Sequence, residues 1–435
     1  MALVTSFVDF VQPLAVVMTA PTWLNFQMIL TGWVFASRRT VTGMIEAAGQ
    51  NGVRHHSLFH RIFAAAAWSL DQLGLAVFDL IVAWCDGVIF LSVDDTLAHK
   101  RGLKVFGAEM HYDPLISSRG KKLTRWGHNW VVLCVVVRFP LWPDRPFSLP
   151  VLFRLYLNTR SAKKHRRKYR TRPQLAVEML GLVCRHCANR RFHLLADSAY
   201  GGQSVLGHLP TNCDLTSRLV LNARLYEAPP ERQPGTKGRT RKRGRRLPAP
   251  RQMLSSRGRR IDLTIYGRST RMRVVDCVAR VFKVPHRDLR IVATEALVGG
   301  RGQEAFFSTC HEAAPEQILT WYADRWSVEV AFHDSKQYLG FEEPQGWSPK
   351  AVQRTAPVAM LLYSLIVTWF ATIGGTNFTR PDRPWYRRER DPSFRDMLAW
   401  LRRESIRHSI SQLGLSGRGS KKVIKTLERL VQLAP

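Results

Sequence analysis

The sequence predicts an α/β protein in which a sheet with helices on its faces lies between helical regions at the two ends. Apolar residues recur at helical spacing up to about residue 86, and short apolar runs of strand composition begin at residue 87. The order that follows is strands, helix, strand, helix and strand, which is typical of an α/β sheet. A long helix beginning at Pro315 then carries a stripe of polar residues.

The balance of charge is strongly positive. The 435-residue chain has 65 Lys and Arg against 33 Asp and Glu, a net charge of +32, and 45% hydrophobic residues. The hydrophobic content argues for a globular protein with a sizeable core. The charge predicts a polyanionic partner, with nucleic acid as the first interpretation and a membrane surface as the alternative.

The cysteines and the apolar segments favour a cytoplasmic protein. Seven widely spaced cysteines, an odd number, do not resemble a disulfide framework. Cys184 and Cys187 have the spacing of zinc ligands but lack a second such pair, so two ordinary thiols are the preferred interpretation. The N-terminus lacks the basic region of a secretion signal. The apolar run at 358–373 is short for a bilayer, and we expect a buried core helix.

The helical region that opens the chain includes segments 40–49 and 57–63, which form either a helix-turn-helix or a plain helical cap. We expect strands at 87–94, 104–111, 130–138, 147–157, 192–197 and 218–226, and helices at 174–187 and 203–208. Segment 227–258 is a basic loop rich in Pro, Gly and Arg, suited to phosphate contact or to a localisation signal. Further strands are expected at 273–283, 289–295 and 306–310, and a basic connector at 380–390 precedes two amphipathic C-terminal helices.

The stripe on the long helix consists of Tyr322, Arg325, Glu329 and Lys336, whose spacings of three, four and seven put them on one face. Apolar residues flank this stripe on both sides, whereas a solvated face would place its charges opposite the apolar residues. We therefore expect the stripe to face a partly buried site in which the carboxylate needs a metal ion or another cation.

Two other acids, Asp94 and Asp197, follow apolar runs of strand composition. Carboxylates at the ends of adjacent strands, facing a Glu from a packed helix, make an oxygen set that suits Mg²⁺. Two such ions support phosphoryl transfer. Taken alone, an Asp at the end of a strand is more often a helix cap or turn former than a metal ligand.

The stripe matches, without a gap, the Tyr-x2-Arg-x3-Glu-x6-Lys signature of a group of cut-and-paste insertion-sequence transposases in the DDE superfamily, which the chain resembles over about residues 87–375. Val93-Asp-Asp-Thr96 resembles the first motif of that family and Asp197-Ser-Ala-Tyr200 the second. The resemblance implies an RNase H-like catalytic core with a β-rich insertion between Asp197 and Glu329, which stand 132 positions apart (329 − 197).

The resemblance also implies roles for individual residues. Asp94, Asp197 and Glu329 would be the catalytic acids that bind two Mg²⁺ ions, for which Mn²⁺ can substitute, and Tyr322, Arg325 and Lys336 would hold phosphates near the transposon end. Trp326 matches an aromatic residue placed near the cleaved end, with a core Trp as the alternative. Asp94 and Asp95 point to opposite faces of a strand; only Asp94 aligns as Asp-x-Thr, and the reverse assignment stays open.

The function implied is a transposase that cuts double-stranded DNA at transposon ends and joins them to target DNA, as a homodimer, in the cytoplasm and on the bacterial nucleoid, with no membrane partner. An RNase H-like nuclease without joining activity and an inactive relic that only binds DNA are the alternatives. Five regions are expected: a helical, candidate DNA-binding region at 1–86, the two parts of the catalytic domain at 87–226 and 311–378, the basic β-rich insertion at 227–310, and a basic helical C-terminal region at 379–435.

Overall fold

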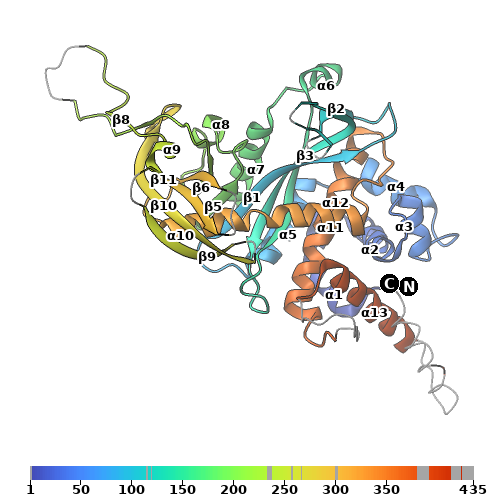
Figure 1. Ribbon diagram of the computed structural model, residues 1–435. Coiled ribbons are helices and arrows are strands. Elements are labelled where there is room, and N and C mark those ends of the chain that lie inside the picture. Colours follow the sequence, from blue (N-terminus) through green and yellow to red (C-terminus); the bar gives the residue numbers. More distant parts are fainter. Residues whose placement is uncertain are drawn as a thin grey trace.

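One large mixed sheet runs through the molecule, with helices packed against it (Figure 1). The computed structural model describes residues 2–113, 116–118, 120–232, 238–255, 258–265, 267–298, 302–379, 391–412 and 423. The strand order is β2-β3-β1-β5-β6-β12-β11-β10-β7-β8, and β4 and β9 pair with β3 and β10 outside that path. The prediction of an α/β protein is therefore confirmed.

The strands are β1 (Ile89–His99), β2 (Glu109–Tyr112), β3 (Thr124–Val137), β4 (Phe147–Tyr156), β5 (Phe192–Ala196), β6 (Cys213–Leu219), β7 (Leu225–Tyr226), β8 (Arg246–Leu247), β9 (Arg259–Ile265), β10 (Arg268–Val281), β11 (Val284–Val298) and β12 (Gln303–Ser308). The helices are α1 (Thr5–Val11), α2 (Ala20–Phe35), α3 (Val41–Ala47), α4 (His56–Ala64), α5 (Leu70–Val82), α6 (Thr159–Lys164), α7 (Arg172–His186), α8 (Gln203–Leu206), α9 (Pro250–Met253), α10 (Pro315–Asp324), α11 (Ser327–Leu339), α12 (Pro349–Trp369) and α13 (Phe394–Ser411).

Most expected elements lie within a few residues of their predicted positions, with two corrections among the strands. The strand expected at 104–111 starts only at Glu109, and the one expected at 218–226 is divided between β6 and β7. The basic connector at 380–390 and the last of the two expected C-terminal helices lie outside the described residues.

The predicted insertion continues the sheet of the catalytic region. Its strand β12 pairs antiparallel with β6, and β11 and β10 follow in order. Sheet hydrogen bonds therefore fix the insertion against β6, the neighbour of the strand β5 that leads into Asp197.

The helix of the polar stripe is interrupted, so the expectation of one continuous helix is wrong. α10 ends at Asp324 and α11 begins at Ser327. Across the break, the amides of Trp326, Val328 and Glu329 donate to carbonyls three residues earlier, in the pattern of a 3₁₀ turn. The tighter turn changes the direction in which Arg325 and Trp326 project.

The apolar helix α12 forms the centre of the core, as predicted. Together with the turn that follows it to Gly374, it is long and apolar enough to cross a membrane, but 83% of its most apolar window is buried inside the protein. It packs against β4, α11, α4 and α5. Burial within the protein thus accounts for its composition.

The N-terminal helices also pack on this core. α3 and α4 correspond to the segments of the possible helix-turn-helix, but residues 48–55 separate them. That connection is longer than the three or four residues of a helix-turn-helix turn. The geometry therefore favours the plain helical cap.

Candidate active site

Asp94 and Asp197 lie level with each other on neighbouring parallel strands. β1 and β5 pair in parallel, and the last pair in their register is Val93 with Ala196. Asp94 and Asp197 are the residues that follow this pair, Asp94 after Val93 and Asp197 after Ala196. The prediction that Asp94 ends its strand is wrong, because β1 continues to His99 through its antiparallel pairing with β3.

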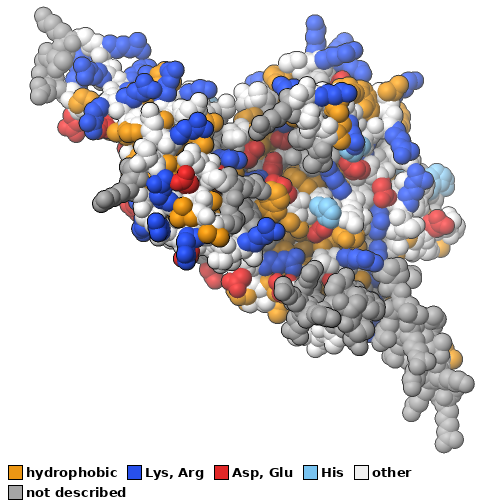
Figure 2. Space-filling model, in the orientation of Figure 1, with side chains coloured by type: hydrophobic (Ala, Val, Ile, Leu, Met, Phe, Trp, Pro, Cys, Tyr) orange, Lys and Arg blue, Asp and Glu red, His pale blue; other side chains and the backbone are white. Residues whose placement is uncertain are grey.

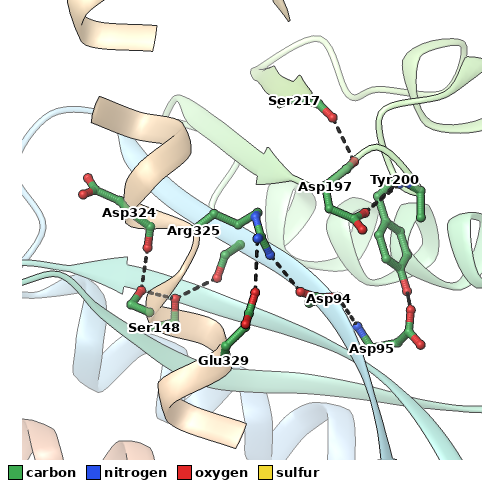
Figure 3. Close-up of polar contacts among 12 residues, drawn as sticks. Asp94, Asp95, Ser148, Asp197, Tyr200, Ser217, Asp324, Arg325 and Glu329 are labelled. Carbon is green, nitrogen blue, oxygen red and sulfur yellow. Dashed lines mark hydrogen bonds and ion pairs between the residues drawn. The ribbon is translucent and has the colours of Figure 1, made fainter. Parts of the chain in front are cut away.

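Asp197 begins the tight turn that leaves β5. One oxygen of its carboxylate accepts hydrogen bonds from the amides of Ala199 (2.9 Å) and Tyr200 (3.3 Å), and its backbone carbonyl accepts one from the Ser217 hydroxyl (2.8 Å). Asp197 is therefore a turn former as well as a candidate ligand. These contacts hold its carboxylate at the edge of the site (Figure 3).

Arg325 joins the first acid to the third. Its guanidinium donates to Asp94 Oδ2 (2.8 Å) and to Glu329 Oε1 (3.2 Å), and it lies between the two carboxylates in Figure 3. Arg325 is 8% exposed, whereas the Glu329 side chain is 39% exposed. The site therefore contains a buried cation of the chain itself, bridging β1 and α11.

Burial and the neighbouring carboxylates make the ionised form of Asp94 less favourable than it would be in water. Burial raises the pKa of Asp94 to about 7; Arg325 opposes this shift, and the nearby carboxylates of Asp197 and Asp95 reinforce it. Burial alone lowers the pKa of Arg325, but Asp94, Tyr322 and Glu329 more than offset this, so that its pKa is raised. The desolvation of Asp94 outweighs its ion pair, and a further cation would stabilise the ionised form.

Tyr322, Arg325, Trp326 and Glu329 line a hollow of about 630 Å³ between the stripe and the insertion. The Arg325 guanidinium carbon lies 5.5 Å from the centre of the Tyr322 ring. Trp326 is 40% exposed, so the alternative of a core Trp does not hold. Two arginines that the sequence analysis missed, Arg218 and Arg268, lie on the opposite wall. No motif identifies them, because strand pairing alone brings them there.

Lys336 lies away from the other residues of the stripe. Its ammonium donates to the Leu97 carbonyl (2.7 Å) and is 3.8 Å from the Glu342 carboxylate. In this arrangement Lys336 ties α11 to the far part of β1. The expectation of a single convergent stripe is met for Tyr322, Arg325 and Glu329 and not for Lys336.

Asp95 faces the other side of β1, as strand alternation requires. Its carboxylate accepts hydrogen bonds from Tyr200 (2.8 Å), Asn129 (2.9 Å) and Arg172 (2.7 Å). All three donors are residues of the protein packed around Asp95, so its carboxylate oxygens already have hydrogen-bond partners. This geometry favours Asp94 as the acid that faces Arg325 and Glu329.

The acids suit a divalent cation in chemistry, although they are not gathered around one. Among the residues that the structure describes, no three His, Cys, Asp or Glu side chains already form a group able to hold a metal ion. However, the donors are carboxylate oxygens, which Mg²⁺ prefers. The Arg325 cation stands between two of them, which shows that positive charge is accommodated there.

Comparison with known proteins identifies the family. A family model described as DDE superfamily endonuclease matches residues 18–273, more than half of the chain. The match includes Asp94 and Asp197 and ends before the helix of Glu329. No curated protein matches the chain. The match agrees with the strands that carry the first two acids, and the chain belongs to the DDE superfamily of endonucleases.

Proposed function

We propose that the protein is a DNA transposase that cuts DNA at the ends of its element and joins those ends to target DNA. The observation that carries this proposal is that Arg325 joins Asp94 to Glu329, while Asp197 follows β5 at the level of Asp94. Membership in the DDE endonuclease family gives the reaction class. The resemblance of the residues on α10 and α11 to the transposase signature supports a transposase over a simple nuclease.

The chemistry proposed is two phosphoryl transfers at one site. In the first, water adds to a phosphorus atom at the element's end and the bond to the 3′ oxygen breaks, leaving a 3′-hydroxyl. In the second, this hydroxyl attacks a phosphorus atom of target DNA and a target 3′ oxygen leaves. Divalent cations held by Asp94, Asp197 and Glu329 would activate the nucleophile and neutralise the leaving oxygen.

The remaining residues would bind and orient the substrate. Tyr322 and Arg325 lie beside the acids in a hollow that also holds Arg268 and Arg218, the latter paired with Glu304 at 2.9 Å. These arginines would bind phosphates. Trp326, which is 40% exposed, would lie near a base at the cleaved end. Lys336 would serve as a phosphate ligand after leaving the Leu97 carbonyl.

The basic surface supports a duplex partner. In Figure 2, Lys and Arg side chains gather along the arm formed by β7, β8 and their connection, and over α6. Described basic residues of the arm include Arg239, Arg241, Lys242 and Arg246, all exposed. Each phosphate contact releases counterions, so DNA affinity should fall steeply with salt.

The decisive experiment supplies the full-length protein with Mg²⁺ and DNA that flanks its gene. Pre-cut ends joined to a target plasmid are the expected product, and Glu329→Gln is the control that should give none. Cleavage without any joined product would make the protein a nuclease that does not join. DNA binding without cleavage would leave only the inactive relic. A homodimer that pairs two ends is proposed as well, and its test is the mass of the end complex.

A further inference from the structure

Three buried serines connect the strand of the first acid to the helix of the third. Ser92 lies two residues before Asp94 on β1, Ser148 lies on β4, and Ser327 opens α11 two residues before Glu329. Ser92 and Ser148 are 0% exposed and Ser327 is 8% exposed. The hydroxyl oxygens are 2.9 Å apart between Ser92 and Ser148 and 2.6 Å apart between Ser148 and Ser327. Ser148 is labelled in Figure 3.

The direction of these hydrogen bonds follows from counting protons. Each hydroxyl carries one proton, and Ser327 donates its proton to the Asp324 carbonyl at 2.7 Å. Ser148 must therefore donate to Ser327, and Ser92 to Ser148. The three residues form one directed chain, which we call the serine bridge, and every hydroxyl in it has a partner.

The serine bridge and Arg325 are two independent connections between β1 and α11. Arg325 uses oxygens of Asp94 and Glu329, which are the atoms that a divalent cation would also need. The serine bridge uses none of these atoms. Ser327 faces the sheet while Glu329, about 200° further round the helix, faces the site. The bridge can therefore remain intact whatever cation the acids bind.

The hydroxyls of the serine bridge form directional hydrogen bonds, which apolar side chains of similar size could not. A satisfied buried network fixes a specific arrangement through directional bonds, whereas small apolar contacts allow sliding and rotation. Here the bonds fix the first turn of α11 against β4 and β1. That turn carries Glu329.

We propose that the serine bridge is a positioning element that sets the separation of Asp94 and Glu329 when Arg325 no longer joins them. Ser92, Ser148 and Ser327 are positioning residues, since none contacts the acids' oxygens. The inference rests on the proposed function, because it requires Asp94 and Glu329 to share a divalent cation.

Ser148→Ala is the informative variant, because it removes the middle of the bridge. Its matched control is Ser364→Ala. Ser364 is also 0% exposed and also ties a helix to β4, donating to the Pro150 carbonyl at 2.8 Å, but it has no link to the acids. The probe is Tb³⁺ binding to the DNA-free, full-length protein, followed by luminescence and competed with Mg²⁺. Cleavage kinetics provide the second readout.

We expect Ser148→Ala to weaken Tb³⁺ binding by about 5–10-fold, the low end for a residue that acts through the ligands' support. kcat should fall by a similar factor with KM for DNA unchanged. Ser364→Ala should leave the Tb³⁺ affinity and kcat within about twofold of the wild-type values. This should hold even if its melting temperature falls as much as that of Ser148→Ala. Ser148→Cys, which keeps a weak donor and acceptor, should recover part of the loss.

Equal Tb³⁺ affinities and equal kcat values for Ser148→Ala and Ser364→Ala would overturn the inference and reduce the bridge to packing. If Ser148→Ala fails to fold, Ser148→Cys and a triple alanine variant without any of the three hydroxyls decide between the same two outcomes. A wild-type protein that binds Tb³⁺ but neither cuts nor joins DNA would sink the proposed function instead.

Discussion

Replacing Arg325 with Gln should make a divalent cation a stronger stabiliser of the protein. Arg325 is 8% exposed and its partner Asp94 has a side chain 19% exposed. Breaking a buried ion pair costs about 3–5 kcal/mol. Glu329 is 39% exposed, and Asp94, with its pKa raised to about 7, can take up a proton. We therefore expect a smaller loss without metal, about 2–3 kcal/mol near pH 7.

Added Ca²⁺ should reverse part of this loss. In the wild type, Ca²⁺ would compete with the guanidinium for oxygens of Asp94 and Glu329, whereas in Arg325→Gln it would meet two carboxylates that have lost this cation. If the variant binds Ca²⁺ tenfold more tightly, saturating Ca²⁺ adds about 1.4 kcal/mol more stability than in the wild type. In a large chain this corresponds to roughly 2–4 °C or less in melting temperature.

The assay is thermal unfolding at pH 7.5 with increasing Ca²⁺ and no DNA. The matched control is Arg138→Gln, because Arg138 pairs with Asp324 at 2.7 Å and contacts none of the three acids. Arg138→Gln should show the same Ca²⁺ response as the wild type. An identical Ca²⁺ response in all three proteins would refute the idea that Arg325 and a metal ion use the same oxygens.

Three further predictions follow from the same geometry. Asp94→Asn, Asp197→Asn and Glu329→Gln should each lower Mg²⁺-dependent cleavage by at least about 10³-fold in a gel assay while leaving Ca²⁺-supported DNA binding intact; full activity in any one removes that residue from the proposed triad. Asp95→Asn should cost only about tenfold in cleavage, since Asp95 supports its neighbours and does not face the site; a loss as deep as that of Asp94→Asn would reverse the assignment of the two acids. Burial lowers the pKa of His193 to about 4. The folded state therefore binds a proton at His193 less readily than the unfolded state does. As a result, the free energy of unfolding should fall by about 3 kcal/mol as pH drops from 6.5 to 4. His193→Gln should flatten the dependence of the unfolding free energy on pH, measured in denaturant titrations. An unchanged dependence would contradict its assignment to His193.

Local pattern in the sequence was enough to predict the secondary structure around the site. The first part of β1 and the whole of β5 are short apolar runs, and α12 is a long one, so their type follows from composition and period. The stripe on α10 and α11 could be found because residues three and four apart share a helix face. These signals lie within a few turns of chain.

Contacts between distant segments could not be predicted in the same way. The pairing of Arg325 with Asp94 spans 231 positions, and nothing in either segment specifies it. Ser148 is a single small polar residue within an apolar strand, a pattern with no periodic signal. Lys336 lies away from the site because its ammonium binds the Leu97 carbonyl. The position of this carbonyl depends on how far β1 extends.

The continuity of the sheet has a consequence for how the hollow can change shape. Arg268 lies on β10, which pairs with β11, and β11 pairs with β12. β12 pairs with β6, and β6 pairs with β5, which leads into Asp197. The wall that carries Arg268 is therefore joined to Asp197 through a ladder of backbone hydrogen bonds, whereas the opposite wall belongs to the interrupted helix pair α10 and α11. A 3₁₀ stretch within a helix often marks a functional hinge, so we expect adjustment to bound DNA at the side chains of Arg325 and Trp326. The break in the helix thus lies at Arg325, the residue whose contacts with Asp94 and Glu329 would change under the proposed metal binding.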